Sequence, residues 1–131
     1  MGYSQGGLSK QGLYYQKDKK AMIYKVTSVP DIYGNSKKSY RPIAAADLWC
    51  YARQLSQEQK FAAAQYGAKE ERIFVFNYHD GVEVYDLVKY RGEWFEITRV
   101  DLPEDYKGGE MFVYVKPARA PKDSEILPYD V

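Results

Sequence analysis

The segment LVKYRGEWFEITRV, residues 87–100, decides the fold class of this chain. Two runs rich in β-branched and aromatic residues, Leu87 to Tyr90 and Glu93 to Val100, flank the dipeptide Arg91-Gly92. Side chains of this kind suit a pleated sheet, and glycine permits a tight turn between paired strands. The segment therefore predicts a β-hairpin inside a β-rich protein.

Further segments of the chain have strand character, because their side chains alternate or because β-branched and aromatic residues occur in a run. They are Ala21 to Ser28, Ala45 to Gln54, Arg72 to Tyr78 and Met111 to Val115. The first ends near Pro30, which cannot donate a ladder hydrogen bond, and the third stops before the turn-forming pair Asp80-Gly81. Val82 to Val84 is expected to add a short bridge.

The polar stretches between these strands predict loops. Asp31 to Arg41 contains Gly34-Asn35 followed by polar and basic residues, a composition typical of an exposed turn. Asp101 to Gly109 is predicted to be an acidic loop. After the last strand, a semi-rigid, extended tail is indicated by Pro117, Pro121 and Pro128.

One short helix interrupts the strands. Ser56 and Gln59 have the spacing of a capping box, and Gly67 is placed to end the helix in a left-handed conformation. A helix of about ten residues is too short to persist in water unless it packs on something. We expect Phe61 and Tyr66 to hold it to the barrel or to a neighbouring subunit.

The predicted fold is mainly β: a small antiparallel β barrel or sandwich with one short α-helical insertion and extended terminal arms. The chain of 131 residues fits one domain. We expect an N-terminal arm at 1–20, the barrel at 21–116 and a C-terminal tail at 117–131. The arm is either mobile or becomes ordered in an assembly through its apolar anchors, Tyr3, Leu8, Leu13, Tyr14 and Tyr15.

The predicted core lies on the faces of the central strands. Trp94, Phe95 and Ile97 are expected to face aromatic residues on neighbouring strands and to fill the barrel interior and its rim. Those expected partners are Phe74, Phe76, Phe112 and Tyr114.

Composition narrows the classes of function. A formal net charge of +1 argues against bulk binding to polyanions. The single cysteine, Cys50, cannot form an intrachain disulfide, and no apolar run of signal-peptide or membrane-span length begins the sequence, so we expect a reducing, cytoplasmic setting and no membrane. Fourteen tyrosines suit both sheet surfaces and protein interfaces.

Catalytic chemistry finds little support in the residues. A Cys-His nucleophile would need Cys50 in contact with His79, yet the pattern places the cysteine in the core and the histidine at a turn. A metal site would have to recruit Asp80, Asp101 or Glu104 without any spacing signature. Carboxylate pairs such as Glu93/Glu96 and Glu104/Asp105 occur routinely on exposed loops and edges. We expect no enzyme, no metal and no cofactor.

Two other classes of function stay open at this point. Lys37, Lys38 and Arg41 surround Tyr33 and Tyr40, a mixture of cations and aromatics that single-stranded nucleic acids use. In this alternative, the chain would be a small β-barrel module that binds nucleic acid or a peptide. The remaining class is a small enzyme or an enzyme accessory.

The order of several motifs resembles the head closure or head-tail joining proteins of tailed bacteriophages over roughly Met22 to Val115. The motifs are Asp31-Ile32-Tyr33-Gly34-Asn35, Asp47-Leu48-Trp49-Cys50-Tyr51-Ala52, Ser56 with Phe61-Ala62-Ala63-Ala64, an apolar strand, and Tyr90-Arg91-Gly92-Glu93-Trp94-Phe95-Glu96-Ile97-Thr98-Arg99-Val100. The long N-terminal arm and the proline-bearing tail depart from the plainest members. A tail-completion protein of the same neck is therefore an alternative.

The resemblance implies a non-catalytic virion protein in the phage neck. It would form a closed ring of its own copies, a dodecamer or alternatively a hexamer, assembled in the host bacterial cytoplasm. The ring would close the DNA-filled head below the portal and adaptor proteins, as a stopper, and would provide the docking surface for the tail terminator or other tail proteins. In some relatives the stretch between the second and third barrel strands, here Leu55 to Glu71, projects into the channel and helps retain packaged double-stranded DNA.

Two groups of residues are the candidates for these contacts. The channel or subunit-interface segment comprises Ser56, Gln57, Gln59, Lys60, Phe61, Gln65 and Tyr66. The interface loops comprise Tyr33, Asn35, Lys37, Lys38, Asp101, Glu104 and Asp105. Terminal arms that wrap around the next copy would enlarge the contact area of a small subunit.

Overall fold

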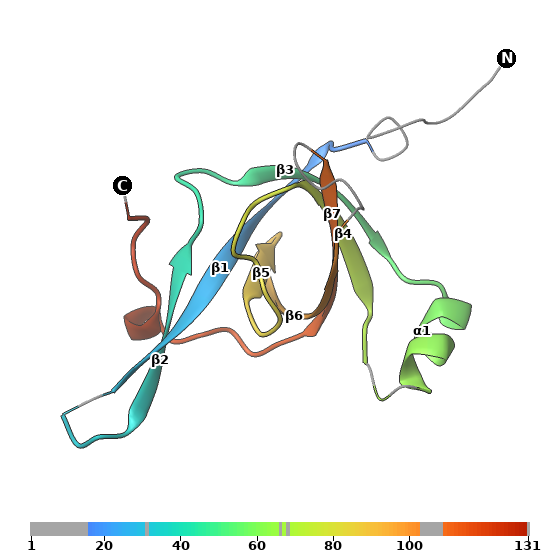
Figure 1. Cartoon of the computed structure of the whole chain (residues 1–131). Helices are drawn as coiled ribbons and strands as arrows, with labels where there is room; N and C mark the ends of the chain where they lie inside the picture. The colour runs from blue at the N-terminus through green and yellow to red at the C-terminus, as the bar shows by residue number, and fades with distance from the viewer. Residues whose placement is uncertain (1–15, 31, 66, 68, 103–108, 131) are drawn as a thin grey trace, which may run out of the picture.

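The computed structural model describes residues 16–30, 32–65, 67, 69–102 and 109–130. Within these residues the strands form a closed antiparallel barrel with one additional strand outside it (Figure 1). In chain order they are β1 (Lys19–Pro30), β2 (Ser36–Pro42), β3 (Leu48–Gln54), β4 (Arg72–Asn77), β5 (Leu87–Tyr90), β6 (Glu93–Asp101) and β7 (Glu110–Pro117). Helix α1 (Gln57–Ala64) follows β3, and a short 3-10 helix, η2 (Asp123–Glu125), follows β7.

The barrel closes between its first and fifth strands. The neighbours run β1-β3-β4-β7-β6-β5, and β5 then pairs with β1 through Met22–Lys89, Ile23–Val88 and Tyr24–Leu87. All strand pairs are antiparallel. The predicted fold class, an antiparallel barrel with one short helical insertion, is confirmed.

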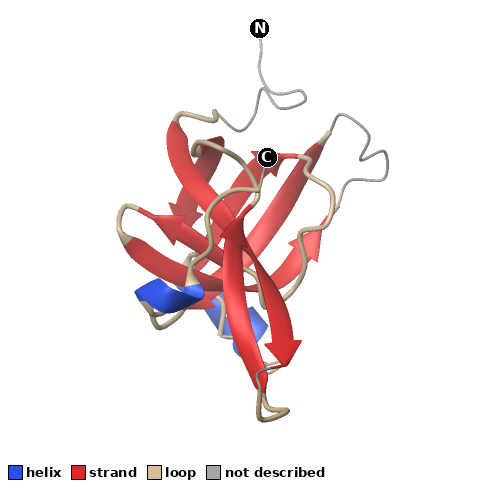
Figure 2. Ribbon diagram, turned by 90° about the vertical axis from the view of Figure 1, so that its left-hand side faces the viewer, coloured by secondary structure: helices blue, strands red, loops and turns tan. Residues whose placement is uncertain are grey.

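Strand β1 belongs to the barrel in its first half and leaves it in its second. Residues 19–21 pair with β3, residues 22–24 with β5, and residues 24–30 with β2. The β1–β2 pair is thus a two-stranded ribbon that extends past the barrel wall (Figure 2). We keep the name ribbon for residues 24–42.

The ribbon corrects one sequence prediction. Asp31 to Arg41 was expected to be an exposed turn, but only the part around Gly34 turns, with φ +82° at that glycine, and Ser36–Pro42 is a strand. Polar residues occupy both faces of a ribbon that stands in water. The alternation of apolar and polar side chains that marks a half-buried strand is therefore missing.

The local signals around the hairpin and the helix are confirmed. Arg91 and Gly92 both have positive φ, +52° and +81°, as a two-residue hairpin turn requires. Ser56 caps α1 with both bonds of the capping box, and Gly67 has φ +81°. Two other boundaries shift: β3 begins at Leu48 rather than Ala45, and Val82 to Val84 forms no bridge but lies in a turn and loop.

The core fills the barrel interior, with one change of face. Phe74, Phe76, Phe95 and Ile97 are buried as predicted. Strand β7 instead buries Met111, Val113 and Val115, so the prediction that Phe112 and Tyr114 point inward is wrong, and Trp94 is only half-buried. Five consecutive apolar residues leave the inward face undecided, because a one-residue shift in phase exchanges the two faces of a strand.

The C-terminal segment returns to the ribbon of its own chain. The expected extended tail contains η2, and beyond it Ile126 forms a parallel bridge with Tyr40. Of the predicted arm at 1–20, residues 1–15 lie outside the described residues, and Lys19 and Lys20 already belong to β1. The domain limits drawn from the sequence stay predictions.

Candidate interaction surfaces

Helix α1 stands off the barrel. No residue of α1 is buried, and Phe61 is 69% exposed, so the expectation that Phe61 anchors the helix to its own barrel is wrong. The helix is instead fixed at its start: Leu55 is buried, and Arg53 Nη1 donates to Gln59 Oε1 at 3.0 Å. Tyr66, the second expected anchor, lies outside the described residues. The exposed side chains of α1 are therefore available to another molecule.

A cleft of about 520 Å³ lies between α1 and the outer wall of the barrel. Leu55, Ala62 and Ala63 provide its apolar wall. Glu70 is buried within it, accepts a hydrogen bond from Thr98 Oγ1 at 2.9 Å and lies 3.4 Å from Arg99 Nε. The cleft thus has an apolar side and a satisfied polar side.

A stacked pair, Arg99 and Tyr114, also lines this cleft. The Arg99 guanidinium lies 3.8 Å from the centre of the Tyr114 ring, and burial raises the pKa of Tyr114. Sequence reasoning missed Glu70, Thr98 and Arg99. The run Lys69-Glu70-Glu71 looks like a solvated stretch, and only the barrel topology brings Glu70 to Thr98.

The tip of the ribbon is the second surface. Ile32 is 89% exposed and Tyr33 is 81% exposed, the two highest values among the large apolar side chains described. In Figure 1 the tip and α1 project from opposite sides of the barrel. The ribbon tip and α1 therefore each present an exposed apolar side chain on a different side of the barrel, and further exposed ones occur at Trp49, Val84, Tyr85, Leu102 and Tyr129.

The basic residues of the ribbon do not form one cluster. Successive residues of a strand point to opposite faces, so Lys38 and Tyr40 lie on one face and Lys37 and Arg41 on the other. Arg41 is also engaged, because its Nη1 donates to the carbonyl of Pro128 at 2.8 Å. This division disfavours the predicted single-strand nucleic-acid site.

The remaining interface-loop candidates are scattered. Asp101 is exposed at the end of β6 and pairs with Arg99 at 3.2 Å. Asn35 is exposed in the ribbon turn. Glu104 and Asp105 lie outside the described residues. The described residues of the predicted acidic loop therefore do not define a binding site.

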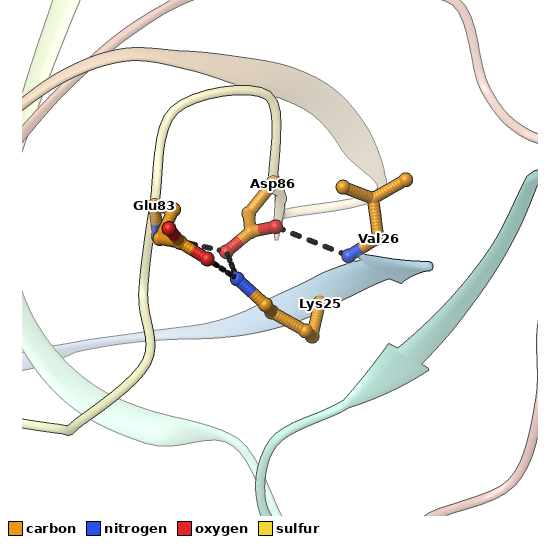
Figure 3. A network of polar contacts seen from close by, with 4 residues as sticks. All are labelled: Lys25, Val26, Glu83 and Asp86. Atoms are coloured by element: carbon orange, nitrogen blue, oxygen red, sulfur yellow. Dashed lines mark hydrogen bonds and ion pairs between the residues drawn. The ribbon is translucent and has the colours of Figure 1, made fainter. Parts of the chain in front are cut away.

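A buried carboxylate fixes the root of the ribbon, although no sequence pattern singles it out. Asp86 is fully buried and accepts hydrogen bonds from the backbone N–H groups of Val26 (3.1 Å) and Glu83 (2.9 Å), as Figure 3 shows. Lys25 Nζ lies 3.3 Å from Asp86 and also binds Glu83. The β1–β5 ladder ends at the pair Tyr24–Leu87, and Asp86, the residue before Leu87, binds the N–H of Val26, two residues after Tyr24, where β1 leaves the barrel.

The charge on Lys25 reflects this network. Burial lowers the pKa of Lys25, but the hydrogen bonds and negative charges of Glu83 and Asp86 outweigh that effect, and the net pKa is raised. The loop that precedes Asp86 holds Tyr85 at φ +80°, which is rare for an aromatic residue. Asp86 therefore ties a strained loop and the ribbon to the same point of the barrel.

The two residues considered for a Cys-His nucleophile lie in different environments. Cys50 is fully buried on β3, whereas His79 is half-buried in the turn after β4. Across the described ranges there is no group of three or more His, Cys, Asp and Glu side chains able to hold a metal ion. In the same part of the chain, no helix has the length and apolar character needed to cross a membrane.

Cys50 should not react with iodoacetamide at about pH 8.5 while the protein is folded, and it should react fully in denaturant. Burial raises the pKa of the Cys50 thiol to about 12. Because the folded pKa exceeds the unfolded value of 9.0, this group's contribution to stability is complete below pH 9 and is lost as the pH rises toward 12. Mass spectrometry of the alkylated protein measures the reaction. Rapid labelling of the native protein would show that the thiol is accessible.

Comparison with known proteins places this barrel in a family. A family model for phage head completion proteins matches residues 16–118, from the start of the described chain to the residue after β7. The chain belongs to the phage head completion protein family. Head completion proteins are structural rather than enzymatic, so this one is a component of the virion.

A solved structure is similar to this head completion protein in fold. The solution structure of protein SF1141 from Shigella flexneri 2a superposes with a TM-score of 0.62 at 13% sequence identity, over 78% of this chain and 93% of that one. At that identity the likeness shows the fold alone. Among curated proteins, nothing matches this chain.

Proposed function

We propose that this head completion protein forms a ring at the head-tail interface, which closes the DNA-filled head below the portal and adaptor and offers a docking surface to the tail. The observation that carries the proposal is the placement of α1 and the ribbon tip on opposite sides of a closed barrel, each with exposed apolar side chains. A contact between two different faces of identical subunits closes into a ring when the rotation permits it.

The segment around α1 is the part proposed to face the channel. Because β2 lies outside the closed barrel, residues 55–71 connect the second and third strands of that barrel, β3 and β4. This is the position of the channel-projecting stretch in the proteins that the sequence resembles. The helix has the freedom this requires, since none of its residues is buried.

The proposed partners follow from this position. They are further copies of the chain in a dodecamer or hexamer, the portal or adaptor proteins above, the tail terminator or tail proteins below, and packaged double-stranded DNA in the channel. The net charge of +1 suits contact with DNA that must later leave, because tight binding to phosphates needs a clear excess of basic residues. The protein then works in the virion neck, after assembly in the host cytoplasm.

Replacing Gln57 to Gln65 by a Gly/Ser linker of equal length tests the role of α1. We expect the melting temperature of the subunit to change little, because no side chain of α1 is buried. Filled heads should lose DNA or fail to accept tails. Electron microscopy of heads made with the variant, together with their DNA content, measures the effect.

A matched pair of point variants separates α1 from exposed apolar surface in general. Phe61→Ser changes α1, whereas Val84→Ser changes an exposed apolar residue in the loop before β5. Only the first should impair head completion. Unfolding of the linker variant, or normal virions that keep their DNA, would contradict this role for α1.

The free subunit should be largely monomeric and should assemble on the portal complex. The exposed apolar side chains occur singly or in pairs at different places on the surface, and small scattered groups of this kind do not by themselves drive association. Sedimentation of the purified chain measures its mass, and electron microscopy of the chain mixed with portal complexes detects the ring. Stable large rings of the purified chain alone would reverse this order of events.

A further inference from the structure

The C-terminal segment crosses from the barrel to the ribbon. Just after β7, the Ala118 N–H donates to the carbonyl of Trp94 at 3.0 Å. The chain then passes η2 and lies along the outer edge of β2, where the Leu127 N–H donates to the carbonyl of Tyr40 at 2.7 Å. Figure 1 shows this segment beside β2, away from β3 and β4. We call residues 122–130 the strap.

The strap is held almost entirely by groups of one strand. Tyr40 accepts its hydrogen bond and forms the parallel bridge with Ile126, and Arg41 donates to the carbonyl of Pro128. None of the residues 118–130 is fully buried. A segment held by edge hydrogen bonds, without side chains in the core, detaches at little cost.

Charge adds to the match between the strap and β2. The strap carries three acidic residues, Asp123, Glu125 and Asp130, against one basic residue, Lys122, whereas β2 carries Lys37, Lys38 and Arg41 and no acidic residue. Burial raises the pKa of Tyr40, and the charge of Glu125 adds to the rise, which places that carboxylate near the β2 edge. An acidic extended segment is therefore the kind of ligand that this edge fits.

We infer that the outer edge of β2 is an interaction surface for the strap of a second copy of this chain, so that straps are exchanged between neighbours in the assembled ring. The inference rests on the proposed ring. The groups that hold the strap come from β2, and β2 of any other copy offers the same groups. The ribbon extends beyond the barrel, so a neighbour can reach its edge (Figure 2).

The chain also has a hinge for the exchange. Between the last bond to the barrel, at Ala118, and the first residue of the strap lie Arg119, Ala120 and Pro121, of which the first two are exposed. Exchange keeps every hydrogen bond between strap and β2, and only the copy that supplies the strap changes. It is therefore a low-cost route to linked subunits. In the free chain, a subunit's own strap occupies its β2 edge, because the tether keeps that strap close. In a ring, the β2 edge of the neighbour is held at a comparable local concentration, so the strap can bind there instead.

Disulfide trapping in the full-length chain tests the exchange. The double variant Tyr40→Cys/Ile126→Cys places two thiols on residues that face each other across the parallel bridge, within the reach of a disulfide. The native Cys50 is buried and does not compete. The free chain should oxidise to a monomer with an internal link. Rings assembled on the portal and then oxidised should give covalent multimers on a non-reducing gel, and neither single variant should.

A second variant tests the same contact without new cysteines. Leu127→Pro removes the N–H that bonds to Tyr40, whereas Leu127→Ala shortens the same side chain but keeps that N–H and serves as the control. Loss of one such bond weakens each subunit contact by about tenfold. Rings of Leu127→Pro should therefore dissociate on dilution before those of the control.

The outcomes separate the two proposals. Rings that form on the portal but show only internal disulfides, or Leu127→Pro rings as stable as the control, would overturn strap exchange and leave the ring intact. If the wild-type chain forms no ring on the portal, the proposed function fails, and strap exchange fails with it.

Discussion

Replacing Phe74 by alanine should lower the free energy of unfolding by about 3–5 kcal/mol. The ring is completely buried and lies 5.2 Å from the ring of Tyr90 and 6.0 Å from those of Phe76 and Phe95, measured between ring centres. Alanine would leave a cavity at the centre of this cluster, and a small domain has only about 5–15 kcal/mol of stability in total. Urea unfolding followed by tryptophan fluorescence measures the change.

The chain contains its own control for this prediction. Phe61→Ala is the same chemical change at a side chain that is 69% exposed, and it should alter stability by no more than about 0.5 kcal/mol. Phe95→Ala, at the edge of the Phe74 cluster, should also cost about 3–5 kcal/mol. Equal unfolding midpoints for Phe74→Ala and Phe61→Ala would remove Phe74 from the core.

Removing the carboxylate of Asp86 should cost about 3 kcal/mol, because Asp86→Ala leaves backbone N–H groups without their acceptor. The N–H groups of Val26 and Glu83 lose their bonds, and Lys25 loses a buried partner. The effect should concentrate at the root of the ribbon. Hydrogen exchange should show a faster rate at the Val26 amide, and denaturant unfolding gives the total change.

Asp86→Asn is the matched variant, since the amide has the same size but no charge. One oxygen can still accept one of the two N–H groups, so the loss of stability should lie between those of the wild type and Asp86→Ala. If Asp86→Ala unfolds at the wild-type denaturant concentration and keeps the Val26 amide protected, the network does not hold the ribbon.

Local chemistry made some elements predictable from sequence. The hairpin at 87–100 follows from strand-forming residues around Arg91-Gly92, and α1 begins at Ser56 because both halves of the capping box lie within four residues. In each case the deciding atoms are close in the chain. Tertiary structure had little opportunity to overrule them.

Elements that depend on distant partners were not predictable in this way. β2 is a strand because β1 pairs with it in the open, although Ser36, Lys37 and Lys38 look like loop residues. The inward face of β7 depends on its register with β4 and β6, across a bulge between Ile97 and Arg99. In the sequence Asp86 resembles an exposed loop residue, because the β1 residue that binds it, Val26, lies far away in the chain.

The candidate surfaces also differ in whether the sequence predicts them. Phe61 was a candidate for the channel or subunit-interface segment and Tyr33 for an interface loop, and the structure exposes both side chains. The role of the strap could not be foreseen, because its partners on β2, the backbone carbonyl of Tyr40 and the side chain of Arg41, lie about 87 residues away in the chain. Backbone hydrogen-bond partners leave no trace in residue identity.

The long strand β1 has a mechanical consequence. One continuous backbone runs from the ribbon tip into the seam with β5, which consists of three residue pairs. In the proposed ring, force applied to the tip by a tail or by pressurised DNA would therefore reach this seam first, before the seam between β1 and β3, which also consists of three residue pairs. A short seam loaded at one end parts pair by pair, so a pulling experiment on the tip should first register the opening of this seam. The ribbon then acts as a lever that transmits force from its tip to the barrel wall.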